Sequence, residues 1–250
     1  MDLSIKPLQS NSKDKVVQPK LAQMGIIPEL LTSSLFVAKS GGGKTTLLLR
    51  LLTDDRFYGG RKSFDEVLLI SPSADGCDLQ KELAEILEIK ESHIITNMDD
   101  AVEALEIVMD KAKEDVAKLG PVLAPKWLLI FDDCITHNAF QKSNAYLRSF
   151  VASRHINATV MACTQSYKKV ERAARLSANN IFFFGNSASY SELECIAEEY
   201  GPPSVKKNEF IEIIREVTKE PYSFLYINNK CHPDKRYRQN LSHVIKIKTT

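Results

Sequence analysis

The chain has 250 residues, of which 44% are hydrophobic and 26% charged, and its formal net charge is +1. A chain of this length and composition can bury a sizeable core as a soluble globular protein. No apolar run reaches the roughly 20 residues that span a bilayer, and the N-terminus lacks a signal-peptide pattern, so no membrane association is expected. The five cysteines are scattered without a C-x-x-C pair, which favours a reducing compartment and argues against a disulfide framework and a structural zinc site.

Charge is distributed unevenly along the chain. Acidic residues outnumber basic ones between residues 75 and 133, whereas basic residues dominate 148–175 and 228–250. This distribution is compatible with a polyanion on one face of the protein. A solvated surface with local charge bias is the simpler explanation.

Residues 1–25 are polar and predict an N-terminal arm, with packing from Ile26, and residues 26–250 predict a single domain with a basic tail. Apolar runs predict strands at 35–37, 64–71, 93–96, 127–133, 158–165, 180–185 and 222–228, and an edge strand at 242–248. Helical patterns occur at 44–53, 78–90, 99–119 (stopped by Gly120), 138–151, 189–200 (with Ser189 and Glu192 as a capping box) and 210–219. This alternation predicts an α/β fold with a mainly parallel sheet covered by helices on both faces.

The stretch from Ser34 to Arg50 has the features of a phosphate-binding loop. A buried strand is followed by three consecutive glycines and then by a helix that opens with Lys44 and Thr45. The backbone N–H groups of such a loop point inward at a helix N-terminus, where partial positive charge favours phosphate. Lys44 would contact the β- and γ-phosphates of ATP, and the Thr45 hydroxyl would be a Mg²⁺ ligand. The predicted nucleotide-binding residues are Ser40, Gly41, Gly42, Gly43, Lys44, Thr45 and Thr46.

This loop departs from the G-x-x-x-x-G-K-[ST] pattern at one position, because Ala38 replaces the first glycine. Alanine is acceptable there if its φ is negative, since only a positive φ calls for glycine. A glycine-rich turn before an ordinary helix is the alternative. The buried strand before the loop and the apolar helix after it favour phosphate binding.

Two acidic residues, Asp132 and Asp133, directly follow the apolar run 127–131. In an open α/β sheet, ligands bind at the carboxyl ends of the strands. Asp132 is predicted to hold Mg²⁺ through water, and Asp133 to be the general base that polarises the attacking water, a task that the longer glutamate performs in many such enzymes. A helix-capping pair at a strand–loop junction is the alternative. The phosphate loop upstream favours the Walker B interpretation.

Gln165 ends the next predicted strand, in the segment 162–166. An amide at this place can hydrogen-bond the γ-phosphate or the lytic water and so report on hydrolysis. The alternative is a polar residue that begins a loop. The order of the three motifs, each at a strand end, favours a catalytic role.

These motifs occur in an order that resembles the HerA–FtsK superfamily, and in particular the poxvirus-type genome-packaging ATPases of large DNA viruses and virophages. The matching segments are 38–45, 128–133, 153–155 and 163–167, and the similarity extends over residues 30–230. The resemblance implies a RecA-like core in which the strand with the catalytic acids lies beside the neighbour of the P-loop strand. It also implies an ATPase that works as a ring, commonly a hexamer, and translocates double-stranded DNA into a preformed capsid.

The same resemblance implies a capsid or portal-vertex protein as partner, and a location in the host-cell cytoplasm, at the virus factory, and also in the virion. Ring ATPases of this type place an arginine finger in the neighbouring subunit's site, where it neutralises charge that develops on the γ-phosphoryl group. Arg154 is the first candidate, and Arg175 and Arg172 come next. Each can instead be an ordinary surface arginine.

Translocation of DNA requires basic residues that contact phosphates without reading bases. Lys168 and Lys169, beside Tyr167, are the predicted contacts.

Three other functions remain compatible with the motifs. A P-loop kinase or GTPase is the first, although the segment 229–232 lacks the aspartate of the N-K-x-D motif that binds guanine. A nucleotide-gated assembly switch with slow hydrolysis is the second. Another DNA pump or helicase of the HerA–FtsK type is the third, because these proteins share the motor motifs and differ in cargo.

Overall fold

The structure, a computed structural model, describes residues 16–73 and 78–247. Its strands are β1 Ser33–Val37, β2 Glu66–Ile70, β3 Ile94–Ile95, β4 Trp127–Asp132, β5 Ala158–Thr164, β6 Asn180–Phe183, β7 Leu225–Asn228, β8 Tyr237–Gln239 and β9 His243–Val244. Its helices are α1 Lys20–Gln23, α2 Lys44–Thr53, α3 Asp78–Ile86, α4 Ala101–Leu123, α5 Asn138–Gln141, α6 Asn144–Ala152, α7 Arg172–Ser177, α8 Tyr190–Tyr200 and α9 Lys207–Val217. A 3-10 helix, Ser153–Ile156, lies shortly before β5.

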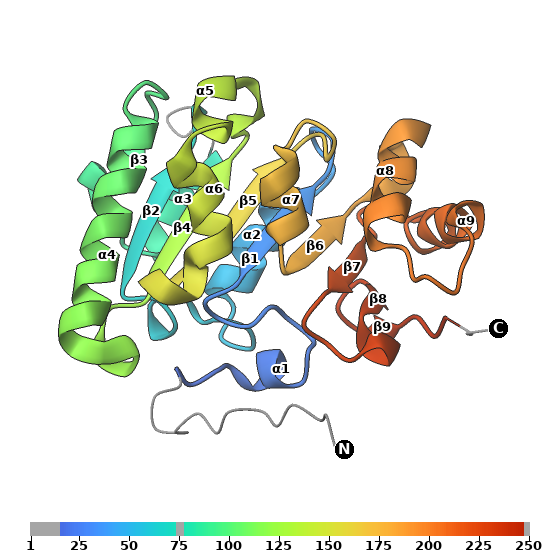
Figure 1. The fold of residues 1–250 in the computed structure, drawn as a ribbon, viewed down its shortest axis with the longest axis horizontal. Helices are drawn as coiled ribbons and strands as arrows, with labels where there is room; N and C mark the ends of the chain where they lie inside the picture. The colour runs from blue at the N-terminus through green and yellow to red at the C-terminus, as the bar shows by residue number, and fades with distance from the viewer. Residues whose placement is uncertain (1–15, 74–77, 248–250) are drawn as a thin grey trace, which may run out of the picture.

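All of these strands belong to one sheet, in the order β3-β2-β4-β5-β1-β6-β7-β8-β9 (Figure 1). The strands from β3 to β6 in this order are parallel, and β7, β8 and β9 continue the sheet as antiparallel strands. The P-loop strand β1 lies between β5 and β6, and β4, which carries the predicted acids, lies on the other side of β5. The mainly parallel α/β fold and its RecA-like strand order are therefore confirmed.

The register brings the three predicted motifs to one edge of the sheet. Val37 at the end of β1 pairs with Thr164 at the end of β5. Asp132 at the end of β4 pairs with Cys163, also near the end of β5. Since parallel strands present their carboxyl ends at a common edge, the residues that follow these strands lie together there.

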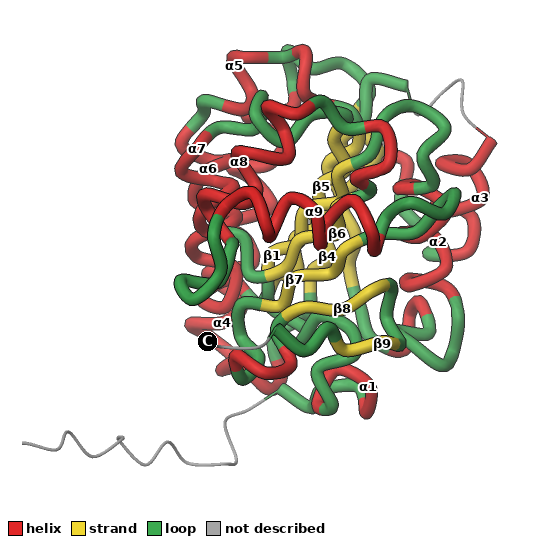
Figure 2. Tube along the Cα trace, turned by 90° about the vertical axis from the view of Figure 1, so that its right-hand side faces the viewer, coloured by secondary structure: helices red, strands yellow, loops and turns green. Residues whose placement is uncertain are grey.

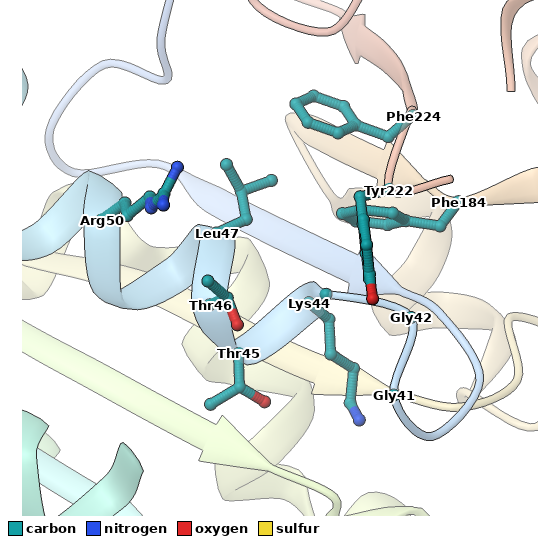
Figure 3. A pocket seen from close by; sticks show the side chains of 11 residues that line it. Gly41, Gly42, Lys44, Thr45, Thr46, Leu47, Arg50, Phe184, Tyr222 and Phe224 are labelled. Atoms are coloured by element: carbon teal, nitrogen blue, oxygen red, sulfur yellow. The ribbon is translucent and has the colours of Figure 1, made fainter. Parts of the chain in front are cut away.

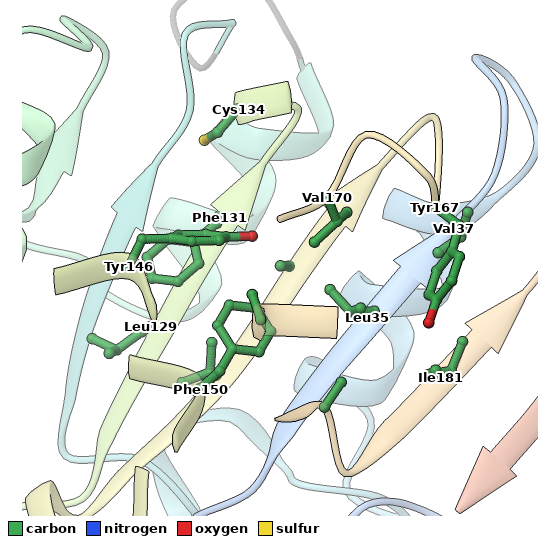
Figure 4. Packing of buried hydrophobic residues seen from close by; sticks show 14 of the residues in the cluster. Leu35, Val37, Leu129, Phe131, Cys134, Tyr146, Phe150, Tyr167, Val170 and Ile181 are labelled. Carbon is green, nitrogen blue, oxygen red and sulfur yellow. The ribbon is translucent and has the colours of Figure 1, made fainter. Parts of the chain in front are cut away.

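Helices cover both faces of the sheet (Figure 2). Alternate residues of a strand point to opposite faces, so Leu35 of β1 packs in one core and Phe36 in the other. The first core also contains residues of α4, α6, α7, α8 and α9, and part of it is drawn in Figure 4. The second core contains residues of α1, α2 and α3, such as Leu48 and Leu83.

Three aromatic rings stack across neighbouring strands in the second core. Phe36 of β1 and Phe182 of β6 have ring centroids 4.4 Å apart and planes within 4°. Phe182 and Tyr226 of β7 have centroids 4.6 Å apart and planes within 8°. Phe224, just before β7, packs edge-on against Phe182 at 5.7 Å. Aromatic pairs stabilise a core beyond the area that they bury, so this column joins the first antiparallel strand to the P-loop strand.

The single helix predicted at 138–151 is wrong, because α5 and α6 are separate helices. The Ser143 hydroxyl accepts a hydrogen bond from the N–H of Tyr146 at 3.1 Å and so begins α6. Between 99 and 123 the predicted interruption occurs at Gly120, where φ is +77°, but a last helical turn follows it and ends at Leu123.

The ends of the domain also differ from the prediction. Packing was expected from Ile26, yet Ala22 of α1 is buried in the second core and Val16 packs against that core. The predicted edge strand at 242–248 is reduced to β9, and β8 was not predicted. The sequence of β8 lacks an apolar pattern, because Arg238, which follows Tyr237, is a charged residue although it is buried. Residues 1–15 of the predicted arm and 248–250 of the predicted tail lie outside the described residues.

Candidate nucleotide-binding and hydrolysis site

The loop between β1 and α2 has the backbone of a phosphate cradle. Gly43 adopts a φ of +95° directly before α2, a conformation that a side chain would strain. A Cβ on Gly42 would lie 2.8 Å from the Cβ of Ala38 and 2.9 Å from the carbonyl oxygen of Lys39. Ala38 itself keeps a negative φ, is buried, and donates its N–H to the carbonyl of Thr164 at 3.1 Å. The alanine in the first glycine position therefore fits the loop without strain.

A cavity of about 580 Å³ opens beside this loop (Figure 3). One wall is the loop and the first turns of α2. The opposite wall is aromatic and consists of Phe184, Tyr222 and Phe224. The residues that line the cavity are Gly41, Gly42, Gly43, Lys44, Thr45, Thr46, Leu47, Arg50, Phe184, Tyr222 and Phe224. Six of the seven predicted nucleotide-binding residues thus face one space, whereas Ser40 is exposed beside it.

The aromatic wall was not predicted as part of the site. Phe184 follows β6 and Tyr222 precedes β7, so the antiparallel pairing of these strands brings both rings to the P-loop. Tyr222 is 68% exposed and has a φ of +63°, which is rare outside glycine. Its ring would lie 3.1 Å from a Cβ on Gly43. An exposed ring that is held over the glycine loop can stack on a planar base.

Lys44, Asp133 and Gln165 meet at the edge of the sheet, as predicted. The ammonium group of Lys44 donates to Oδ2 of Asp133 at 3.3 Å, and the amide of Gln165 donates to the same oxygen at 3.2 Å. Lys44 is buried and Asp133 is half-buried. One carboxylate oxygen therefore joins the phosphate loop, the end of β4 and the end of β5.

Asp132 is buried, 3% exposed, and its side chain is held by a residue that was not predicted. The amide of Gln80, from α3, donates to Oδ2 of Asp132 and to the hydroxyl of Ser71 at 2.9 Å. Burial raises the pKa of Asp132 and the charge of Asp133 adds to this rise, while the hydrogen bond from Gln80 and the charge of Lys44 oppose it. The sequence did contain a signal for Gln80, which stands three positions before Leu83 and seven before Leu87, on the apolar face of the predicted helix, although its side chain is polar.

These residues fit a Mg²⁺ ion. Oδ1 of Asp132 and Oδ1 of Asp133 are both buried, and neither has a hydrogen-bond partner among the described residues. The Thr45 residue lines the adjoining cavity. Mg²⁺ is typically bound by one or two carboxylates together with phosphates and waters, so a Thr45 hydroxyl and Asp132 suffice as the protein's contribution.

The arginine candidates have different environments. Arg175 is engaged within its own chain: its guanidinium donates to Glu199 at 2.8 Å and to the carbonyls of Lys168 and Val170. This arrangement corrects the expectation that Arg175 is available as a finger. Arg154 is exposed in the 3-10 helix at the opposite end of β5 from Gln165, and no residue among 16–73 and 78–247 forms an ion pair with it. It therefore lies away from the hydrolysis site of its own chain.

Lys168 and Lys169 are exposed in the turn that follows Gln165. They lie three and four positions after the residue that contacts Asp133. The predicted DNA contacts are therefore exposed and close in the chain to Gln165. Among the described helices, none has the length and apolar character needed to cross a bilayer.

Comparison with known proteins identifies one family. The model of the family described as poxvirus A32 protein matches residues 32–246. No curated protein shows significant similarity to the chain.

Solved structures with a similar fold include two viral packaging enzymes. The genome packaging NTPase B204 from Sulfolobus turreted icosahedral virus 2, in complex with ATP-gammaS, is 15% identical and superposes with a TM-score of 0.55, over 79% of this chain and 92% of that chain. The DNA-packaging ATPase B204 from Sulfolobus turreted icosahedral virus is 16% identical with a TM-score of 0.54, over 80% and 93% of the two chains. At such identities the likeness shows the fold.

Proposed function

Because the chain belongs to the poxvirus A32 protein family and is an ATPase, we propose that it uses ATP hydrolysis to drive double-stranded DNA into a preformed viral capsid. The observation that carries the proposal is the contact of Lys44 and Gln165 with the same oxygen of Asp133. It joins a phosphate loop, an acid and a sensor amide at one point, which is the arrangement that γ-phosphate hydrolysis requires.

The residues of the site have separate tasks in this mechanism. The backbone N–H groups of the loop bind the phosphates, and Lys44 exchanges Asp133 for the γ-phosphate when ATP enters. Asp133 is then free to accept the proton of the attacking water, which the Gln165 amide orients. Thr45 and Asp132 would hold a Mg²⁺ ion, which would supply positive charge against the phosphate oxygens.

In this proposal the aromatic wall binds the base. A purine that follows the phosphates along the cavity can stack on Tyr222, and Phe184 and Phe224 exclude water from its other edge. The face of an aromatic ring accepts any base. This wall therefore supplies affinity, and discrimination between adenine and guanine requires polar contacts elsewhere.

A ring of subunits, a hexamer in this proposal, completes the site. Charge that develops on the γ-phosphoryl group needs a positive group in addition to Lys44. Arg154 lies at the far end of β5 from its own site, so it can serve only the site of a neighbour. A finger in trans links hydrolysis in one subunit to the position of the next.

Lys168 and Lys169 are the proposed contacts with the DNA backbone. Both lysines are exposed and lie in the turn after Gln165. In this proposal, Gln165 senses the γ-phosphate, and the lysines follow it closely in the chain. Contacts with phosphates are independent of base sequence, as packaging of a whole genome requires. The proposed partner at the end of the process is a capsid or portal-vertex protein, and the proposed location is the virus factory of the host-cell cytoplasm and the virion.

ATPase activity with and without double-stranded DNA tests the proposal. Wild type should hydrolyse ATP and accelerate when DNA is added, and Lys44→Ala should lose activity by about 100-fold or more. Lys39→Ala is the matched control, because Lys39 is an exposed lysine of the same loop. Turnover that is indifferent to DNA in every assembly state would contradict the pump and favour the assembly switch. Strand separation of a forked duplex would instead indicate a helicase.

A further inference from the structure

Glu192, in the first turn of α8, binds a different partner from the one its sequence context predicts. The predicted capping box is half formed, since the Ser189 hydroxyl accepts the N–H of Glu192. The Glu192 carboxylate, however, faces the turn after β5. It accepts the Ser166 hydroxyl, the N–H of Tyr167 at 2.9 Å and the N–H of Lys168 at 3.2 Å. One carboxylate therefore holds three consecutive residues of that turn.

These three residues directly follow Gln165. The Gln165 side chain is exposed and makes one hydrogen bond within the described structure, to Asp133 at 3.2 Å. Its direction is thus set by the backbone that carries it rather than by packing. Hydrogen bonds from N–H groups to a carboxylate are about twice as strong as those between neutral groups, so Glu192 is the main restraint on that backbone from the α8 side.

A small cavity connects the same residues to the phosphate loop. It has a volume of about 170 Å³, and its wall includes Gln165, Ser166 and Glu192 together with Ala38 and Lys39. The end of β5, the beginning of the loop and the first turn of α8 therefore border one space. Glu192 is thus near both the residue that carries the sensor amide and the beginning of the phosphate loop.

We propose that Glu192 is a positioning residue for hydrolysis, which holds the turn after β5 so that the Gln165 amide points at Asp133. This inference rests on the hydrolytic role proposed for Gln165 and Asp133. Glu192 acts through Gln165 and does not itself touch the nucleotide.

Two variants separate the hydrogen bonds from the charge. Glu192→Ala removes every bond to the turn. Glu192→Gln keeps a carbonyl oxygen that can accept the N–H groups of Tyr167 and Lys168 and therefore should retain most of the positioning. Glu198→Ala is the control, because Glu198 is an exposed acid of the same helix whose partner, Lys207, also pairs with Glu194.

All assays are performed without DNA, so they do not depend on translocation. Glu192→Ala should lower kcat about tenfold and change KM for ATP less than about twofold, since a misplaced group costs rate rather than binding. Glu192→Gln should recover to within about threefold of wild type. The amides of Tyr167 and Lys168 should exchange with solvent faster in Glu192→Ala alone. Stoichiometric binding of ATP-gammaS would show that the slower variant is still correctly folded.

The inference fails if Glu192→Ala, with full ATP-gammaS binding, hydrolyses ATP as fast as Glu198→Ala. It also fails if the two amides are not protected in wild type. An inactive wild type would instead overturn the proposed function, and amide exchange would still decide whether Glu192 holds the turn.

Discussion

Lys44 and Asp133 form an ion pair at the phosphate loop. Their side chains are 7% and 27% exposed, and the atoms lie 3.3 Å apart. A buried ammonium group without a partner would be costly, and Asp133 provides that partner for Lys44. Bound phosphate must compete with Asp133 for Lys44. A substitution at Asp133 should therefore change the affinity for ATP as well as the rate of hydrolysis.

Asp133→Asn should lower kcat by about 100-fold or more, because the amide cannot accept the proton of the attacking water. ATP binding should be preserved or tightened, since a neutral residue holds Lys44 less strongly. Calorimetric titration with ATP and steady-state ATPase assays measure the two effects. Asp133→Glu restores the carboxylate as a control. A Kd that rises in parallel with the loss of kcat would contradict the mechanism.

Tyr222→Ala should weaken ATP binding by about 1–3 kcal/mol, the value of one base–aromatic stack. Tyr222→Phe keeps the ring and should bind as wild type does. Binding of inorganic triphosphate, which has no base, should be equal in all three proteins. Equal loss of ATP and triphosphate affinity would mean that Tyr222 supports the P-loop rather than the base.

At the scale of elements, α7 and α8 are joined by Arg175, Glu199 and Tyr167. The Tyr167 hydroxyl donates to Glu199 at 2.6 Å, and the Arg175 guanidinium lies over the Tyr167 ring at 5.3 Å. Burial by itself would raise the pKa of Glu199, but the hydrogen bonds from Arg175 and Tyr167 outweigh it and lower the pKa. The turn that contains Lys168 and Lys169 is therefore held by Arg175 of α7 and by Glu199 of α8.

Glu199→Gln should change how stability depends on pH. Because the folded-state pKa of Glu199 lies below its ordinary value of 4.5, the ionised carboxylate stabilises the fold above pH 4.5, and this contribution is lost as the pH falls through the lowered pKa. Wild type should thus be more stable than Glu199→Gln at pH 7, and the difference should shrink below pH 4.5. Urea unfolding at several pH values measures it. A difference that is constant with pH would exclude the carboxylate as its source.

At the scale of the whole molecule, Arg154 lies before the amino end of β5, whereas the P-loop follows the carboxyl end of the neighbouring strand β1. If Arg154 serves a neighbour, mixed rings of Arg154→Ala and Asp133→Ala subunits contain some sites with an intact acid and an intact finger. The mixture should regain ATPase activity that neither variant has alone. Arg148→Ala mixed with Asp133→Ala controls for loss of a nearby arginine. Mixed rings that assemble but stay inactive would exclude Arg154.

Much of this site could be predicted because its residues follow short, strongly apolar strands. The glycine loop follows β1, Asp132 ends β4 and Gln165 follows β5, and a parallel sheet brings such strand ends together. Gln80 and Tyr222 could not be placed in the same way. Gln80 reaches Asp132 by packing of α3, and Tyr222 reaches the loop through an antiparallel pairing that no local pattern encodes. The finger proposed for Arg154 would depend on a second subunit, whose placement the sequence of one chain does not encode.

The column of Phe36, Phe182 and Tyr226 has a consequence for how the protein melts. Phe224 packs on this column, and the wall it shares with Tyr222 is therefore anchored to the strand that carries the phosphate loop. We therefore expect the two halves of the nucleotide pocket to unfold together. Heating should abolish base binding and phosphate binding in a single cooperative transition, with no intermediate that retains either.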